Sequence, residues 1–439
     1  MNDERKLIYL ASFSHFITHG YMTLLPAVLV VIAADQSMSF MDIGIIANIG
    51  YFLYGLGAFP AGHMADKYGS KRMLTIGVFG MAVSSILVGL SPTILTFGIA
   101  YGILGCFASI HHPAGLSLIA RRIQSKKGKA LGTHGVLGNV GLFVTPLIAS
   151  SCIWLFNSWR AAYIIFGLIG ILFALKLYFV RIDKEPDLLF SDLMRRKKRS
   201  ERETVESPQG LSEDNQQPQK FIIPVSLLLL YVGSILSGFI FRGSLTFFPA
   251  LFQREIGFIT NNDQPVVIAG FLTTGVLSLG LISSWFGGYI NDRIKRPELF
   301  PMLLFVVVAP ALYLISRFSD NRLVVAAAVF SLFFYAWQPS QNYLIAKYTK
   351  KASHGKGFGI NFFLIFGVGS IATASGGYVA DNYGIDRFYW FMSIIAFIAI
   401  AAAWLVYLFQ RYQFRFNWQL TRDEDSISST EPEHQPAKP

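Results

Sequence analysis

Long apolar runs separated by short polar segments dominate the chain, and this pattern predicts helices that cross a membrane. A helix needs about 20 apolar residues to span the hydrocarbon core of a bilayer. Twelve stretches meet this requirement, at residues 7–33, 42–64, 73–91, 94–119, 130–153, 160–180, 222–250, 266–289, 299–316, 323–346, 357–380 and 388–410. The predicted fold class is therefore all-α integral membrane, with twelve transmembrane helices.

Two polar segments divide the chain further. One lies between the sixth and seventh spans and contains the basic run RRKKR; the other follows the last span and ends in Ser, Pro and Glu. Charged and polar sequence of this kind does not bury enough apolar surface to fold alone. We expect an N-terminal six-helix bundle over 1–182, a cytoplasmic linker over 183–221, a C-terminal six-helix bundle over 222–412 and a disordered cytoplasmic tail over 413–439.

A glycine-bounded charged turn between the second and third spans has a second copy in the other half. At an offset of 226 positions, the sequence repeats Gly62, Asp66 and Lys67 as Gly288, Asp292 and Arg293. Lys129 and Gly132 also recur, as Lys356 and Gly359, at an offset of 227. One offset that recurs at distant sites indicates a duplicated chain, and hence two pseudo-symmetric halves.

A third, shorter echo lies at the end of the eleventh span. The segment GYVADNYG, from Gly377 to Gly384, repeats the GxxxDxxG frame of Gly62 to Gly69. By the predicted topology it faces the opposite side of the membrane. Many transporter halves contain inverted three-helix repeats, in which matching turns fall on opposite faces.

The first turn resembles the loop signature of the major facilitator superfamily between its second and third helices, through Gly62, Asp66, Lys67, Gly69, Lys71 and Arg72. The resemblance extends from about residue 7 to residue 410. It implies two six-helix halves that rock about a central cavity, with both turns acting as a gate on the cytoplasmic side. The second copy departs from the signature, because Ile294 stands at the position of Tyr68 and Gly69 has no glycine counterpart.

Composition and charge support a membrane protein and argue against nucleic-acid binding. Only 14% of the residues are charged, whereas soluble domains carry about 25%. The net charge of +11 is distributed asymmetrically, since the loops assigned to the outside hold only five of the 37 basic residues: Arg160, Arg254, Arg317, Arg322 and Arg387. Cytoplasmic loops are enriched in Lys and Arg, so we expect both termini in the cytoplasm and the chain in a bacterial inner membrane.

The predicted spans lack internal Asp and Glu, which leaves histidine as their titratable side chain. Five of the eight histidines fall in amino-half spans, namely His15, His19, His111, His112 and His134. Imidazole titrates near neutral pH, and ionisable groups inside membranes usually mark a pathway. The alternative is neutral histidines hydrogen-bonded between helices. The spacing of His15 and His19 could also suit zinc, but no acid or cysteine joins them, so no metal site is expected.

Arg242, in the middle of the seventh span, is the most distinctive single candidate. A guanidinium at the centre of a transmembrane helix costs at least about 2.5–3.5 kcal/mol. A substrate carboxylate, phosphate or phosphonate would stabilise it with bidentate geometry. The alternative is that Arg242 snorkels or pairs with a backbone carbonyl. Further polar candidates for a cavity lining are Asn139, Asn361, Tyr335, Gln338 and Gln341.

The segment from His111 to Gly115 resembles the His-Pro element in the fourth helix of the fosmidomycin-resistance branch, which implies export of a small phosphonate. These patterns favour a secondary transporter that moves a small anionic or amphipathic organic solute by proton-coupled efflux. The alternative is a proton-coupled importer of a siderophore, organic acid or other nutrient. We expect a monomer in the bilayer that uses the proton gradient without a cofactor. The predicted spans contain no pair of a nucleophile and a base that would suggest an enzyme.

Overall fold

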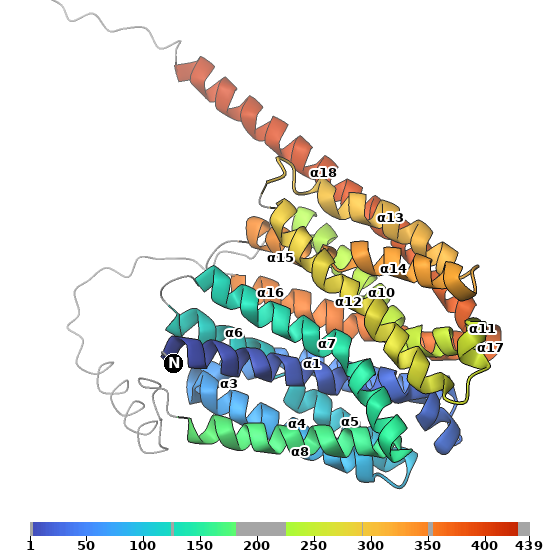
Figure 1. Ribbon diagram of the computed structural model, residues 1–439. Helices are drawn as coiled ribbons and strands as arrows, with labels where there is room; N and C mark the ends of the chain where they lie inside the picture. The colour runs from blue at the N-terminus through green and yellow to red at the C-terminus, as the bar shows by residue number, and fades with distance from the viewer. Residues whose placement is uncertain (1–2, 124–126, 181–224, 292, 350–353, 429–439) are drawn as a thin grey trace, which may run out of the picture.

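The computed structural model describes residues 3–123, 127–180, 225–291, 293–349 and 354–428, and it is helical with no strand over these ranges. The amino half contains α1 (Asp3–Asp35), α2 (Phe40–Leu56), α3 (Ala58–Tyr68), α4 (Ser70–Leu90), α5 (Ile94–Ala108), α6 (His111–Arg122), α7 (Lys127–Phe156) and α8 (Trp159–Phe179). In Figure 1 these helices form the lower bundle, and the carboxy half forms the upper one.

The carboxy half follows the same plan with more interruptions. It contains α10 (Val225–Glu255), α11 (Gly257–Thr260), α12 (Pro265–Asn291), α13 (Leu299–Ile315), α14 (Asp320–Phe334), α15 (Trp337–Tyr348), α16 (His354–Phe362), α17 (Ile371–Tyr383) and α18 (Ile385–Ser428). A π-helical turn (Phe363–Gly367) and a 3₁₀ turn (Val368–Ser370) connect α16 to α17. The predicted linker, 183–221, lies outside the described residues.

The all-α membrane fold is confirmed. In the described part of the chain, ten helical segments are long and apolar enough to cross a membrane. The pair α2 and α3, bent by 42°, supplies an eleventh. The remaining expected span is α13, an apolar helix of 17 residues, about 26 Å long at 1.5 Å per residue. It is slightly shorter than the hydrocarbon core of a typical bilayer.

Two broken spans occupy equivalent places in the two halves. The break between α5 and α6 falls at residues 109–110, and the break between α14 and α15 falls at 335–336. Pro113 and Pro339 follow each break. A helical proline clashes with the carbonyl four residues earlier. That carbonyl belongs to Ser109 in the case of Pro113 and to Tyr335 in the case of Pro339. The two breaks are 226 positions apart, as the two charged turns are, and this shared offset supports the duplication.

The echo between the two GxxxDxxG turns is also visible in the backbone. Gly69 after α3 has φ 92°, and Gly384 after α17 has φ 99°; they are the two described glycines with positive φ. An L-residue rarely adopts this conformation, which explains the glycine at both positions. The two turns lie at opposite ends of the bundle (Figure 1), as an inverted repeat requires.

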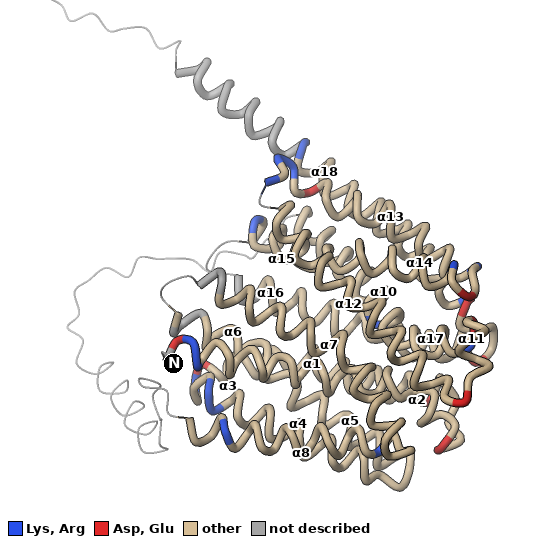
Figure 2. The backbone as a smooth tube through the Cα atoms, in the orientation of Figure 1, with Lys and Arg blue, Asp and Glu red and all other residues tan. Residues whose placement is uncertain are grey.

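The halves are held together most directly at the end of the bundle away from the amino terminus. There the Asp381 carboxylate accepts hydrogen bonds from the backbone N–H groups of Phe40 (3.0 Å) and Met41 (2.8 Å) at the start of α2. Thr373 of α17 donates to the Gly44 carbonyl over 2.9 Å. Lys and Arg residues gather at the end that carries the amino terminus, and most of the Asp and Glu residues in view lie at the opposite end (Figure 2).

One expectation about the ends of the chain needs correction. We expected a disordered tail from residue 413, but α18 continues as a helix through Ser428 and extends beyond the bundle (Figure 1). A single helix satisfies its backbone hydrogen bonds internally, so it needs no packing partner to complete them. Residues 429–439 lie outside the described residues.

Candidate functional site

Five histidines from three spans lie against one another in the amino half. His15 is central, with ring centroids 4.6 Å from His19, 4.8 Å from His111, 5.0 Å from His112 and 4.3 Å from His134. All five side chains are buried. Residues that are widely separated in sequence therefore form one histidine cluster, defined here as these five side chains.

Local structure explains how the cluster assembles. His15 and His19 lie one turn apart on α1 and therefore share a face. His111 and His112 open α6, directly after the proline-induced break. His134 comes from α7, where Gly138 makes room for the cluster, because a β-carbon at Gly138 would fall only 2.3 Å from the His15 ring.

The ring nitrogens are largely without partners. The Nδ1 atom of His15 lies 2.8 Å from the His134 backbone oxygen; since a carbonyl only accepts, Nδ1 carries the proton and Nε2 keeps a lone pair. The Nδ1 atom of His111 lies 3.0 Å from the Ser14 hydroxyl. The Nε2 atoms of all five histidines are buried without a hydrogen-bond partner among the described residues. Such groups are rare in native proteins and call for a functional explanation.

Arg242 of α10 is buried among aromatic rings, with 2% of its surface exposed. Its Cζ atom lies 3.9 Å from the ring centroid of Tyr51, 4.9 Å from that of Phe366 and 5.3 Å from that of Phe241. Among the described residues it forms no ion pair with a carboxylate, and its Nε atom has no hydrogen-bond partner. Ring faces stabilise a cation by about 0.5–2 kcal/mol each but leave its charge uncompensated.

The histidine cluster and Arg242 meet at the interface between the halves. His112 stacks on Phe362 (4.8 Å, 27°) and Phe366 (6.0 Å, 17°) from the carboxy half. Phe366 also contacts Arg242, which packs on Tyr51 from the amino half. Relative movement of the two halves would therefore change the surroundings of both charged groups.

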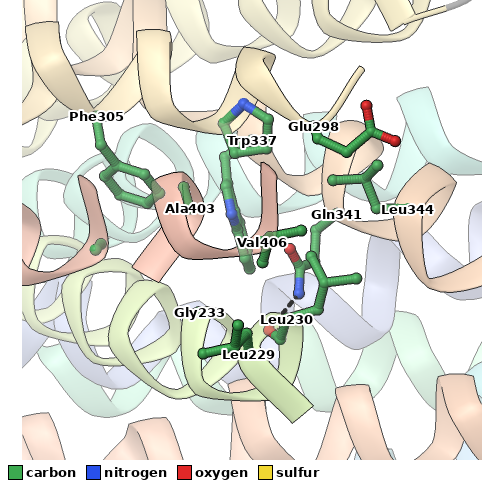
Figure 3. Close-up of a pocket in the computed structure, with 12 residues that line it drawn as sticks. Leu229, Leu230, Gly233, Glu298, Phe305, Trp337, Gln341, Leu344, Ala403 and Val406 are labelled. Carbon is green, nitrogen blue, oxygen red and sulfur yellow. Dashed lines mark hydrogen bonds between the residues drawn. The ribbon is translucent and has the colours of Figure 1, made fainter. Parts of the chain in front are cut away.

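Two predicted site residues of the carboxy half, Gln341 and Asn361, are joined by hydrogen bonds. Gln341 donates to the Leu230 carbonyl over 2.7 Å (Figure 3) and to the Ser234 hydroxyl over 2.8 Å. Ser234 lies 2.6 Å from the Asn361 side-chain oxygen, and Asn361 donates to Asn342 over 3.4 Å. Gln341 and Asn361 thus join α10, α15 and α16.

The remaining cavity candidates, Asn139, Tyr335 and Gln338, contact other elements. Asn139 of α7 donates to the Ser284 hydroxyl of α12 over 3.4 Å, which links the two halves. Tyr335 packs edge-on against Phe143 at 4.7 Å, and its buried hydroxyl has no partner among the described residues. Gln338 is partly buried at the start of α15.

The charged turns lie at the end of the bundle that carries the amino terminus. Gly62, Asp66 and Lys67 belong to the last turns of α3, and Lys71 and Arg72 open α4. Lys71 donates to the Tyr178 carbonyl of α8 over 3.2 Å, a contact within the amino half. In the second copy, Gly288 lies in the last turn of α12, Arg293 packs over the Tyr289 ring at 3.6 Å, and Asp292 lies outside the described residues.

Sequence reasoning missed the aromatic lining and one buried acid. Phe362 and Phe366 are four residues apart, a spacing that signals a shared helix face. Glu298, before α13, accepts hydrogen bonds from Lys347 (2.7 Å) and Tyr348 of α15. Burial alone would raise the pKa of the Glu298 carboxyl, but these hydrogen bonds outweigh burial and hold its pKa below the usual value.

Two helical bundles that share a polar, charged interface inside a multi-span membrane protein define a solute transporter. The sequence model described as "Major Facilitator Superfamily" matches residues 11–373 and 230–435. The chain belongs to the major facilitator superfamily, and it is a transporter and not an enzyme.

Individual relatives agree with this family. The chain is 23% identical over 411 residues to a probable hexose phosphate transport protein of Chlamydia pneumoniae, covering 89% of this chain and 86% of the relative. It is 23% identical over 420 residues to the multidrug resistance protein MdtG of Proteus mirabilis, covering 92% and 96%. A crystal structure of a bacterial homologue of the human lysosomal transporter Spinster, inward-facing and occupied, has a TM-score of 0.75 at 14% identity, over 92% and 97% of the two chains.

Proposed function

We propose that this transporter moves a small anionic organic solute across a bacterial inner membrane by proton-coupled alternating access, in the direction of efflux. Arg242 binds the acidic group of the solute, and histidines of the cluster exchange protons. The observation that carries the proposal is the buried Arg242 guanidinium, which lies among aromatic rings without a carboxylate partner in the described chain.

The physical argument rests on the charge of the interface. A guanidinium remains protonated at any physiological pH, and the ring faces around Arg242 do not neutralise it. An anionic solute would provide both compensating charge and bidentate hydrogen bonds. Close to it, imidazoles can gain or lose a proton near neutral pH when water reaches them. The solute and the proton would then occupy neighbouring positions at the interface of the halves.

Orientation follows from charge. The basic residues of α1, α3 and α4 gather at one end of the bundle (Figure 2), and the positive-inside rule assigns that end to the cytoplasm. Because the halves are bridged at the opposite end by Asp381 and Thr373, we assign the described conformation as closed toward the outside.

Import of an acidic nutrient is the second candidate. A hexose phosphate, the solute in the name of one relative, carries a phosphate that matches the chemistry of Arg242. The same site would serve either direction, because alternating access is reversible and the coupling gradient decides the net flux. Resistance to an exported toxic phosphonate, measured against uptake of a labelled hexose phosphate in cells, separates efflux from import.

Binding to the purified protein tests the site directly. We expect acidic solutes, screened as hexose phosphates, phosphonates and organic acids, to raise the unfolding temperature in a thermal-shift assay. Their uncharged counterparts, such as glucose beside glucose 6-phosphate, should not. Arg242→Gln should abolish the shift, because a removed charge-assisted hydrogen bond costs about 1.5–3 kcal/mol.

The matched control is Lys176→Gln, which removes a cation from an exposed position of α8. This variant should bind acidic solutes as the wild type does. Unchanged binding by Arg242→Gln, or equal stabilisation by the uncharged solutes, would show that Arg242 is not the anion contact.

A further inference from the structure

Three histidines at the centre of the cluster combine the spacing and the ring orientation of a metal site. His15, His19 and His112 each place a ring nitrogen within 4.8 Å of those of the other two. Their rings stand at steep mutual angles of 68°, 82° and 87°. An imidazole binds a metal in the plane of its ring, so rings at steep angles can direct their nitrogens to one point.

A second set, His15, His111 and His134, has the same nitrogen spacing but an unsuitable orientation. Its rings are nearly parallel, with interplanar angles of 19°, 19° and 17°. Nitrogen lone pairs in parallel rings do not converge unless the rings rotate. The geometry therefore distinguishes His19 and His112 as ligands from His111 and His134 as stacking neighbours.

The chemical state of the three rings also suits a metal. The Nε2 atoms of His15, His19 and His112 are buried and have no hydrogen-bond partner in the described chain. His15 donates its other ring nitrogen to the His134 carbonyl at 2.8 Å, which fixes the tautomer that leaves Nε2 free to coordinate. Metal-binding histidines typically have such an outer hydrogen bond. In a tetrahedral zinc site with Zn–N distances of about 2.0–2.1 Å, the rings would need to move together by about 1.5 Å at most.

We propose that His15, His19 and His112 bind a divalent transition-metal ion of the Zn²⁺ class. The spacing HxxxH on α1 supplies two ligands, and the break before α6 brings in the third. The sequence alone did not predict a metal site, because no acid or cysteine joined His15 and His19 as a further ligand. His111 and His134 stack on the His15 ring without serving as ligands, and the fourth coordination position is open to another ligand.

Charge identifies that fourth ligand as an anion. Arg242 and His112 both pack on the ring of Phe366, so a bound divalent ion and the guanidinium would bring three positive charges close together. An acidic group between the metal and Arg242 would compensate this charge and coordinate the ion. This step rests on the proposed function, and it narrows the solute to an acid that is carried as a metal complex; the three-histidine site does not depend on it.

Cobalt titration tests the metal site. The probe is Co²⁺ alone, added to full-length protein purified without a histidine tag, with visible absorption reporting the geometry of the bound ion. We expect one tetrahedral Co²⁺ per chain, displaced by Zn²⁺, which binds such sites more tightly. His19→Gln and His112→Gln should each weaken Co²⁺ binding at least about tenfold.

The matched controls are His111→Gln, inside the cluster, and His63→Gln, at an exposed position of α3. Both should bind Co²⁺ with the tetrahedral spectrum, and thermal unfolding checks that every variant is folded. If the wild type binds no Co²⁺, if binding survives His19→Gln and His112→Gln, or if only His111→Gln removes it, the assignment of the three ligands is wrong.

Inorganic phosphate then tests the fourth ligand. Phosphate should change the Co²⁺ spectrum of the wild type and tighten Co²⁺ binding, and Arg242→Gln should lose this effect while still binding Co²⁺ alone. If phosphate has no effect on bound Co²⁺, the bridging anion is wrong. If Co²⁺ does not bind but acidic solutes still require Arg242, the metal site fails and the proposed function stands. If Co²⁺ binds but acidic solutes bind without Arg242, the proposed function fails and the metal site stands.

Discussion

Arg242 depends on its aromatic neighbours more than on any polar partner. Tyr51 lies under the guanidinium at 3.9 Å, and its hydroxyl donates to the Met22 carbonyl over 2.7 Å. The hydroxyl therefore anchors the ring to α1 and also interacts with the guanidinium, while the ring face packs on Arg242. The ring and the hydroxyl thus contribute separately to the site.

Substitution at Tyr51 separates these roles. Tyr51→Leu removes the ring face, worth about 0.5–2 kcal/mol, and should weaken binding of an acidic solute several-fold in the thermal-shift assay. Tyr51→Phe keeps the ring and loses the hydroxyl's interactions with Met22 and Arg242, so it should bind the solute more tightly than Tyr51→Leu does. Equal loss of binding in both variants would mean that the hydroxyl, and not the ring, supports the site.

At this scale the sequence predicted some contacts and missed others. The spacing of His15 and His19 placed both on one face of a helix, and their rings are in contact. The meeting of α1, α6 and α7 depends on long-range packing, which spacing within one helix does not encode. Gln341 and Asn361 were predicted to line a cavity; Gln341 does line a pocket (Figure 3), and hydrogen bonds through Ser234 that the sequence did not predict join the two side chains.

At the scale of the helix, proline-induced breaks and polar ties at helix ends shape the interface. The break before α6 lets His111 and His112 enter the core of the amino half. The equivalent break before α15 lets Trp337 enter the core of the carboxy half. In the carboxy half, Glu298 fastens the start of α13 to the end of α15 through Lys347 and Tyr348. Helix boundaries within broken spans were not predicted, because apolar content runs through both parts.

Glu298→Gln should destabilise the carboxy half by about 1.5–3 kcal/mol, because it removes charge-assisted hydrogen bonds. The folded pKa of Glu298 lies below its ordinary value of 4.5. Its contribution is therefore fully present above pH 4.5 and is lost as the pH falls through the folded pKa. Thermal unfolding of wild type and variant from pH 7 to pH 3 measures this difference.

The control is Asp386→Asn, which changes a partly exposed acid whose ion pair in the described chain is with the adjacent Arg387. It should leave the unfolding temperature nearly unchanged across this range. A deficit of Glu298→Gln that persists undiminished at the acid end would show that packing, and not the carboxylate, accounts for it.

At the scale of the whole molecule, the chain consists of two related halves whose contacts differ between the two ends. The charged turns, the matching breaks and the glycines at positive φ all agree with duplication and inverted repeats. The family and the fold could be predicted from the sequence, because hydropathy and one recurring offset determine them. The contacts between the halves could not be predicted from the sequence, because they depend on side-chain shape. The close approach of Gly44 to Thr373 is an example.

Asp381→Ala removes two hydrogen bonds that join the halves at the end away from the amino terminus. Loss of a helix cap costs about 0.5–2 kcal/mol, so the population open at that end should rise several-fold. Spin labels measure the distance between the halves. They are attached to cysteines introduced at the exposed positions of Ala34, near the end of α1, and Asn262, just after α11, in a variant without Cys106 and Cys152. A larger fraction of long distances is expected.

The control for this experiment is Asp386→Ala, a nearby acid without a bond to the other half. It should give the wild-type distance distribution. A distribution unchanged by Asp381→Ala would show that these hydrogen bonds do not hold the halves together.

Flux through proteoliposomes tests the central claim, that a buried guanidinium and imidazoles at the interface of the halves move an acidic solute. The measurement compares wild type, Arg242→Gln and Lys176→Gln, each with and without a pH gradient, using the acid that stabilises the wild type most. The account predicts gradient-dependent flux in wild type and Lys176→Gln, and none above protein-free vesicles in Arg242→Gln. Normal flux through Arg242→Gln, or wild-type flux that ignores the pH gradient, would contradict it.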